Sequence, residues 1–250
     1  MTPLRQRIRA AHRGEAPVLR GPFLAVPSPM VVEIACGSFP DFVCIDMEHG
    51  PIDPSTGEGM VRAAAVHRVA ALVRVPGNDP VAIAQALDWG AAGVLVPRVN
   101  SAAEALAAVD AARYPPEGSR GAGPGRAAGY GRDIPRYLDR ARAETVVAVQ
   151  VETVAGLEAA AEIAAVPGVD LVFVGPGDLG VGLAAAARPE SVAQAVDRIL
   201  AACAGAGCPA GIFAMSREGL APFAGRIALG IAGSDASVLV AGFDAAFGSA

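Results

Sequence analysis

The sequence predicts an α/β fold, a single-domain TIM (β/α)8 barrel in which parallel strands alternate with helices. Three observations support this class. Short apolar runs rich in β-branched residues recur, and most are followed by a turn and an alanine-rich helical stretch. Runs such as VVAV and LVFV are apolar throughout, which is typical of strands covered on both faces. The length of 250 residues suits one barrel, so residues 1–250 are expected to form one domain.

The expected strands and helices follow one another in a regular order. Strands are expected at residues 23–26, 42–46, 71–75, 93–96, 146–151, 171–174, 210–214 and 227–232. Helices are expected at residues 56–68, 80–89, 102–113, 154–164, 189–205 and 236–247. Asp79 and Ser101 are suitable N-caps, and Pro80 suits a first helical position. An open doubly wound sheet shows the same alternation, but eight units in 250 residues favour the closed barrel.

Residues 114–143 break this rhythm, because glycines and arginines crowd together there before a short helix. A long functional loop after the fourth strand explains the segment without a second domain. Within it, Arg120 is expected to reach inward and bind substrate, with an ordinary surface loop as the alternative.

All twenty basic side chains are arginine, and the chain contains no lysine. This excludes a lysine Schiff base, attachment of pyridoxal phosphate and a P-loop lysine. If the protein generates a carbanion, a metal ion or another cofactor must therefore accept the electrons.

The net charge, the apolar segments and the cysteines limit the possible binding partners and the cellular compartment. A formal charge of −5 gives no general attraction to nucleic acid or to an anionic membrane. The N-terminal segment lacks the apolar core of a secretory signal, and no apolar run is long enough to span a membrane. The four cysteines form no C-x-x-C pair and are expected to be reduced and buried. A cytoplasmic location is expected.

Polar residues follow several expected strands at their carboxyl ends, where the active sites of such barrels lie. The second strand ends in Asp46-Met47-Glu48-His49, and the third ends at Arg74. The fifth runs through Gln150 to Glu152, and the sixth is followed by Gly175-Pro176-Gly177-Asp178. Strand ends converge in a closed ring, so we expect these side chains to lie together at one mouth.

Two carboxylates are candidates for a metal site at this mouth. Glu152 and Asp178 arrive from neighbouring strands, and hard carboxylate oxygens suit Mg²⁺ or Mn²⁺. The alternative is that Glu152 caps the following helix and that Asp178 stabilises a turn. The glycine-rich stretch 175–180 could also present backbone N–H groups to an anion at a helix N-terminus.

His49 and Arg74 are candidates for the chemistry itself. A histidine at a strand end can act as a general base, with Asp46 or Glu48 orienting it, although a structural histidine is the alternative. Arg74 closes an apolar run, where a buried charge needs a partner. A substrate carboxylate, an enolate oxygen or a salt bridge to Asp46 would each serve.

Around these residues, six ordered stretches cover about two-thirds of the chain and resemble one family. They are DFVCIDMEHGP (41–51), LVRVPGNDP (72–80), ALDWGAAGVLVPRVNSAAEA (86–105), RYPPEGSRGAG (113–123), VVAVQVET (146–153) and PGVDLVFVGPGDLG (167–180). The chain resembles the HpcH/HpaI aldolase/citrate lyase family, the class II pyruvate-dependent aldolases of hydroxy-keto acids, which include enzymes for 2-keto-3-deoxy sugar acids.

The resemblance implies a reversible aldol reaction of 4-hydroxy-2-oxo acids, giving pyruvate or an analogue and an aldehyde through a metal-bound enolate. It implies that Glu152 and Asp178 hold a divalent ion, Mg²⁺ or Mn²⁺, with Co²⁺ or Zn²⁺ also admissible. Pyruvate is then expected beside Gln150 and the backbone of Gly175, Pro176 and Gly177.

The same resemblance assigns the remaining catalytic roles. Arg74 would stabilise the enolate oxygen, and His49, supported by Asp46, would act as the base on the aldol hydroxyl. Asp88 would enter the site of a neighbouring subunit and help to position His49. Similar proteins are hexamers, trimers of dimers, with the C-terminal helix exchanged between subunits.

Two departures from the family motif border the substrate. Gly177 stands where alanine is usual, and Gly180 where serine is usual. These departures affect the expected specificity for the aldehyde. The sequence does not determine the aldehyde, the natural metal, the stereochemistry, or whether cleavage or synthesis is the biological reaction. Two alternatives remain: a lyase of the citrate or malyl-CoA type, and a barrel that binds a keto acid without catalysis.

Overall fold

The computed structural model describes residues 2–248 and forms a closed barrel of eight parallel strands. Each strand pairs with its neighbours in chain order, and the first pairs with the last. The strands are β1 (Leu19–Leu24), β2 (Phe42–Asp46), β3 (Ala70–Arg74), β4 (Gly93–Val96), β5 (Val146–Val151), β6 (Leu171–Val174), β7 (Ala210–Ala214) and β8 (Leu229–Ser234). The predicted barrel is therefore confirmed.

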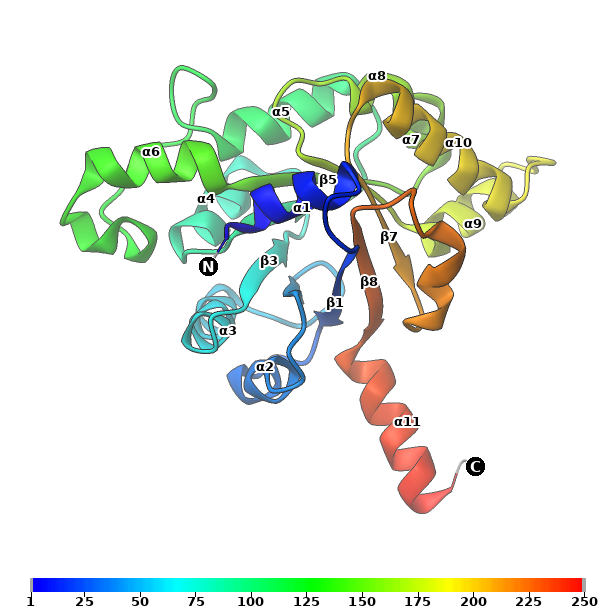
Figure 1. Ribbon diagram of the computed structural model, residues 1–250, viewed down its shortest axis with the longest axis horizontal. Helices are drawn as coiled ribbons and strands as arrows, with labels where there is room; N and C mark the ends of the chain where they lie inside the picture. Colours follow the sequence, from blue (N-terminus) through cyan, green and yellow to red (C-terminus); the bar gives the residue numbers. More distant parts are fainter. Residues whose placement is uncertain (1, 249–250) are drawn as a thin grey trace.

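Helices surround the strands, as Figure 1 shows. They are α1 (Leu4–His12), α2 (Pro29–Cys36), α3 (Pro54–Val66), α4 (Pro80–Asp88), α5 (Ala102–Ala112), η1 (Arg126–Gly131), α6 (Ile134–Glu144), α7 (Val154–Glu158), α8 (Ala160–Ala164), α9 (Pro176–Ala185), α10 (Val192–Ala206), η2 (Glu218–Phe223) and α11 (Asp235–Phe247). Asp79 and Ser101 cap α4 and α5 as predicted, and Pro80 opens α4.

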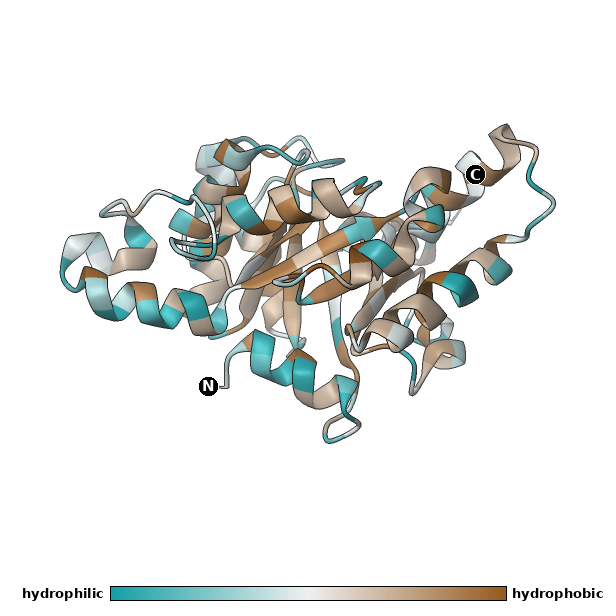
Figure 2. Cartoon of the chain, turned by 90° about the horizontal axis from the view of Figure 1, so that it is seen from above, coloured by the Kyte–Doolittle hydropathy of each residue, from teal (hydrophilic) through white to brown (hydrophobic). Residues whose placement is uncertain are grey.

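The interior of the barrel is a separate apolar cluster, because alternate residues of each strand point inward. Phe42, Leu72 and Phe173 belong to this cluster, and α1 closes the amino end of the barrel with Leu4 and Ile8. A second cluster fills the layer between the strands and the outer helices. Figure 2 shows the hydrophobic colours gathered on the central strands and the hydrophilic ones toward the outside of the helices.

The sequence missed several elements at the start of the chain and after β6. Helices α1, α2 and α9 were not expected, and β1 begins four residues before its expected start. Pro22 interrupts the apolar run of β1, whose pairing with β8 shifts between Gly21 and Phe23. Helix α9 contains two interior glycines, which weaken a helix, but it buries Leu179 and Leu183. The helix expected at 154–164 is divided at Ala159.

The segment 114–143 lies at the amino end of this barrel. It follows α5, which runs away from the mouth, and it contains η1 and α6. A cavity of about 340 Å³ brings Arg120 and Tyr137 of this segment together with residues at or next to the starts of β3, β4 and β5, including Ala70, Ala92 and Thr145. Arg120 therefore lies away from this chain's own mouth, and its expected binding of substrate would require the mouth of a neighbouring copy.

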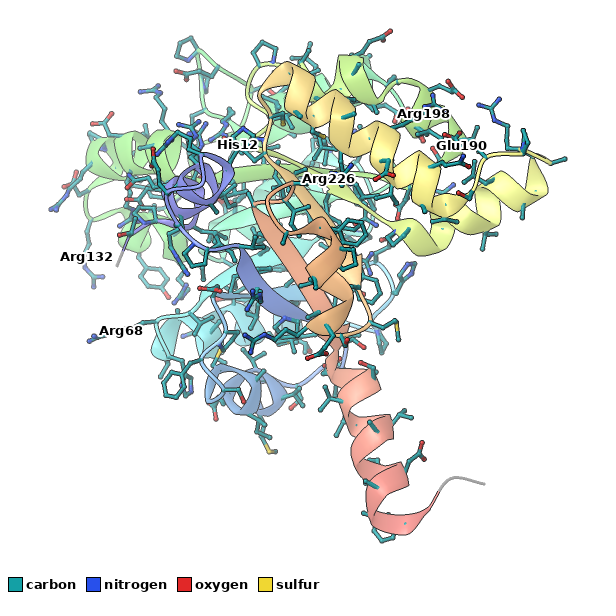
Figure 3. All side chains as sticks on the ribbon, turned by 45° about the vertical axis from the view of Figure 1, so that its right-hand side comes forward. His12, Arg68, Arg132, Glu190, Arg198 and Arg226 are labelled. Carbon is teal, nitrogen blue, oxygen red and sulfur yellow. The ribbon has the colours of Figure 1, made fainter. Side chains whose placement is uncertain are left out.

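Other expectations concern the cysteines and the surface. Cys36, Cys44, Cys203 and Cys208 are all buried and free, as predicted. Within residues 2–248, no helix combines the length and apolar character needed to cross a membrane. Helix α11 extends away from the barrel in both Figure 1 and Figure 3. On another part of the surface, Figure 3 shows Glu190 beside Arg198, and these two residues form a 2.8 Å ion pair.

Candidate active site

The polar residues reach the mouth because of strand register. In β2, Phe42 and Cys44 point into the barrel, and the period of two places Asp46 on the same side. Asp46 pairs in register with Arg74 on β3. On β5, Ala148 lies in the interior cluster, so Gln150 and then Glu152 continue its face toward the carboxyl end. The sequence correctly predicted this convergence.

Arg74 is held on three sides by its neighbours. Its Nε and Nη2 donate to the two carboxylate oxygens of Asp46 at 2.8 and 2.6 Å. Its Nη1 lies 3.1 Å from Oε2 of Glu48, and its guanidinium carbon lies 4.3 Å from the centroid of the Phe23 ring. Of the three partners that the sequence allowed for this charge, the structure shows the salt bridge to Asp46.

The environment keeps Arg74 charged. Burial acts to lower its pKa, but the hydrogen bonds and charge of Asp46 raise the pKa above the ordinary value. Arg74 and Asp46 are only 6% and 4% exposed, so little water screens the pair. The result is a fixed positive charge at the mouth.

His49 lies just beyond β2 and its side chain is 60% exposed. The backbone N–H of His49 donates to Oδ1 of Asp46 at 3.3 Å. The nearest acidic contact of the imidazole is Glu48, whose Oε2 lies 3.8 Å from Nε2. Asp46 therefore holds the backbone of His49, and the side chain faces a different carboxylate.

Glu152 is almost completely buried, at 1% exposure. Its Oε1 accepts the backbone N–H of Arg98 at 2.8 Å, and Oε2 accepts a hydrogen bond from Nε2 of Gln150. Burial raises the pKa of Glu152, the two hydrogen bonds oppose this, and the charge of Asp178 raises it further. Strands β5 and β6 are neighbours and Asp178 lies in the first turn after β6, so both carboxylates belong to the same side of the mouth. Thr153, not Glu152, caps the following helix.

Three features of the site fit a bound cation. Among residues 2–248, the buried Oε1 of Gln150 has no hydrogen-bond partner. Gly175 leaves space beside the carboxylate, because a Cβ there would lie 2.8 Å from Oε2 of Glu152. Asp178 stands exposed in the first turn of α9, after Pro176. The described part of the chain contains no cluster of three acidic, histidine or cysteine ligands, so a metal here would need water or substrate oxygens.

Two predicted site residues lie at the other end of the barrel. Asp88 is the last residue of α4, and its Oδ1 accepts a hydrogen bond from Nη2 of Arg120 at 2.6 Å. The same Nη2 donates to the hydroxyl of Tyr137 at 3.1 Å, and the guanidinium lies over the ring of Tyr114. Arg120 does not reach this chain's own mouth, because the helix before it carries the chain to the amino end. Only another copy of the chain could use either residue in its site.

Other contacts at the mouth were not predicted. The contact of Glu48 with Arg74 was missed, although its position two residues after Asp46 was a usable signal. The hydrogen bond from the backbone N–H of Arg98 to Glu152 had no signal in the sequence. It depends on a φ of +53° at Arg98, a conformation that sequence patterns assign to glycine.

Comparison with known proteins identifies close relatives of this chain. A model of the HpcH/HpaI aldolase/citrate lyase family matches residues 20–240. The chain is 40% identical over 207 residues to a 4-hydroxy-2-oxovalerate aldolase of Novosphingobium aromaticivorans, covering 82% of this chain and 78% of that protein. It is 40% identical over 238 residues to a hydroxypyruvate/pyruvate aldolase of Deinococcus radiodurans, covering 92% and 86%.

The fold agrees with these sequence relationships. The crystal structure of an HpcH/HpaI aldolase/citrate lyase family protein from Burkholderia cenocepacia superposes with a TM-score of 0.87 at 35% identity. The match covers 97% of this chain and 96% of that one.

Proposed function

This chain belongs to the HpcH/HpaI aldolase/citrate lyase family, and from that premise we propose that its polar mouth breaks and forms a carbon–carbon bond beside a keto acid. The chain is a carbon–carbon lyase, a class II pyruvate aldolase acting on 4-hydroxy-2-oxo acids or on hydroxypyruvate adducts. The observation that carries the assignment of the site is the fixed guanidinium of Arg74 on the same mouth as Glu152.

A divalent ion is proposed to bind between Glu152 and Asp178, since the family is one of metal-dependent aldolases. Two carboxylates and the unpartnered Oε1 of Gln150 provide the oxygen-rich surroundings that Mg²⁺ and Mn²⁺ prefer. When bound, the ion supplies Lewis-acid polarisation of the keto group. The lack of lysine, which excludes a Schiff-base route, agrees with this assignment.

The chain's own residues then supply charge and proton transfer. In the cleavage direction His49 accepts the proton of the C4 hydroxyl, the C3–C4 bond breaks, and the aldehyde leaves. The electron pair moves toward the keto oxygen, where Arg74 offers its fixed positive charge. Protonation at C3 completes the keto acid. Gln150 and the backbone at Gly175–Gly177 are proposed to orient its carboxylate and keto oxygens.

The active protein is proposed to be a homo-oligomer, with a hexamer built from dimers as the specific form. Helix α11 leaves the barrel and exposes Val238, Val240 and Phe243, which are apolar side chains that a second copy could cover. Asp88, at the amino end of the barrel, is 40% exposed and so can reach the mouth of a neighbouring subunit.

A coupled assay of pyruvate release tests the function. The substrates are a panel of 4-hydroxy-2-oxo acids and hydroxypyruvate adducts, with the protein first treated with EDTA and then supplied with Mg²⁺, Mn²⁺ or Co²⁺. We expect activity to disappear on chelation and to return with metal. Activity that is indifferent to EDTA would exclude the metal role of Glu152 and Asp178. No turnover of these substrates would favour the alternatives. Cleavage of malyl-CoA in a separate assay of acetyl-CoA release would then favour the lyase, and its absence would favour a binding protein.

A further inference from the structure

The carboxylate of Asp46 is fully engaged by groups other than the His49 imidazole. Its Oδ1 accepts from Nε of Arg74 and from the backbone N–H groups of Glu48 and His49, at 2.8, 3.1 and 3.3 Å. Its Oδ2 accepts from Nη2 of Arg74 at 2.6 Å. The side chain is 5% exposed, so no open face remains for another partner. Asp46 therefore serves to orient Arg74 and the turn after β2.

Glu48, and not Asp46, is the carboxylate that lies close to the imidazole of His49. Its side chain is only 10% exposed, and its Oε2 lies between Nη1 of Arg74 at 3.1 Å and Nε2 of His49 at 3.8 Å. In the described chain this buried oxygen has no partner with hydrogen-bond geometry. A buried carboxylate oxygen that accepts no well-aligned hydrogen bond is costly, so a donor that moves a few tenths of an ångström to reach it gains stability. The exposed imidazole of His49 has the freedom to do so.

We propose that Glu48 is the positioning residue within the same chain that holds the His49 imidazole over the substrate, while Asp46 positions Arg74. This inference deepens the proposed function and rests on it. As His49 accepts the substrate proton it becomes an imidazolium, and the adjacent carboxylate of Glu48 stabilises that charge. Through Nη1 of Arg74, the same oxygen also links the base to the residue that faces the keto oxygen.

The charged neighbours of Glu48 lie on or directly after strands β2, β3 and β5. Arg74 on β3 and His49 favour its ionised form, whereas Asp46 on β2 and Glu152 after β5 oppose it. Burial is the largest effect and raises the pKa of Glu48. Asp46 makes two hydrogen bonds to the Arg74 guanidinium, whereas Glu48 has an ion-pair contact without hydrogen-bond geometry. Replacing Glu48 with its neutral isostere should therefore affect the base more than the fold.

The first test is kinetic, and it compares Glu48→Gln with Glu48→Asp and the wild type. We expect Glu48→Gln to lower kcat about 10- to 100-fold with little change in KM, because proton transfer and not binding is impaired. The acidic limb of its pH–rate profile should move to lower pH by roughly half a unit or more, because the imidazolium loses a stabilising anion. Glu48→Asp keeps the charge and should recover part of kcat.

Glu58→Gln is the matched control, since Glu58 lies on α3 and, among residues 2–248, forms an ion pair with the exposed Arg62 alone. Its kinetics should equal those of the wild type. A wild-type kcat and pH profile in Glu48→Gln would overturn the proposal, and so would an effect confined to KM.

The second test does not depend on activity. The ring signals of His49, assigned by NMR, should move in Glu48→Gln and stay in place in Glu58→Gln. Unmoved signals in Glu48→Gln would overturn the proposed contact even if the wild type proves inactive in the aldolase assay. Failure of the inference is thereby distinguished from failure of the proposed function.

Discussion

The buried guanidinium of Arg74 depends on Asp46 for its charge balance. Two ionised groups below 7% exposure are stable only when paired with good geometry, and this pair has two short hydrogen bonds. Asp46 also ties down the backbone of the next turn through Glu48 and His49. Removing its charge should therefore affect stability and activity together.

Asp46→Asn should lower the free energy of unfolding by about 3 kcal/mol, because it removes the hydrogen-bonded counter-charge of a buried guanidinium and leaves only the contact with Glu48. It should lower kcat/KM roughly 100-fold or more, because the enolate-facing charge loses its fixed orientation. Urea unfolding and the pyruvate assay measure the two effects. Asp197→Asn is the control, since Asp197 pairs with Arg226 at an exposed surface site and should change neither quantity. Wild-type stability in Asp46→Asn would contradict the account of this pair.

Residue pairing at the mouth was predictable where strand period and register determine it. Asp46 and Arg74 end neighbouring strands on the same face, so their contact follows from two correctly placed strands. The backbone donor of Arg98 to Glu152 was not predictable, because it depends on a left-handed φ at a residue that is not glycine. Arg120 lies at the amino end because its segment follows helix α5, and a loop after a strand and a loop after a helix face opposite ends of the barrel.

The turn from β6 into α9 is the element on which the proposed metal site depends. A Cβ at Gly175 would lie 2.8 Å from Oε2 and 2.9 Å from Cβ of Glu152, and 3.0 Å from Nε2 of Gln150. Both side chains are buried, so neither can yield without disturbing the other. The glycine is needed here for space and not for its backbone conformation.

Gly175→Ala should displace Glu152 and weaken metal binding. We expect the concentration of Mn²⁺ that gives half-maximal activity to rise at least tenfold, roughly the loss seen when groups that support a metal ligand are altered. Gly182→Ala is the matched control in the same helix, because its Cβ would make only an ordinary 3.8 Å contact with Val154. Equal Mn²⁺ dependence in the two variants would show that the carboxylate of Glu152 is not a metal ligand.

Elements with a clear pattern were predicted, and those without one were not. Strands β2, β4, β5, β6 and β7 have their expected bounds because they are apolar on both faces and flanked by turn residues. Helix α9 was not predicted because glycines disfavour a helix, although Leu179 and Leu183 are four residues apart and both buried. Helix α1 was missed because it closes the barrel from outside the strand–helix repeat.

At the scale of the whole molecule, α11 is the feature that the single barrel does not explain. Its start is anchored by Asp235, which accepts the backbone N–H groups of Ala25 and Val26 at 3.0 and 2.9 Å. Beyond that point its apolar side chains face outward, with Val240 and Phe243 each 60% exposed. An apolar helix extending from a domain is typical of a surface that another copy covers.

Replacing Val240 and Phe243 together with Glu should therefore break the assembly. Sedimentation velocity should give a multiple of the 25.0 kDa chain for the wild type and a smaller species for the double variant, with an unchanged circular dichroism spectrum. Asp244→Asn, on the same helix, is the control and should keep the wild-type mass.

If Asp88 completes the site of a neighbour, kcat should fall with the loss of assembly, because each separated barrel retains Arg74 and Glu152 but loses the partner's carboxylate. A double variant of wild-type mass would contradict the proposed interface, and a smaller species with full kcat would show that each barrel is complete by itself.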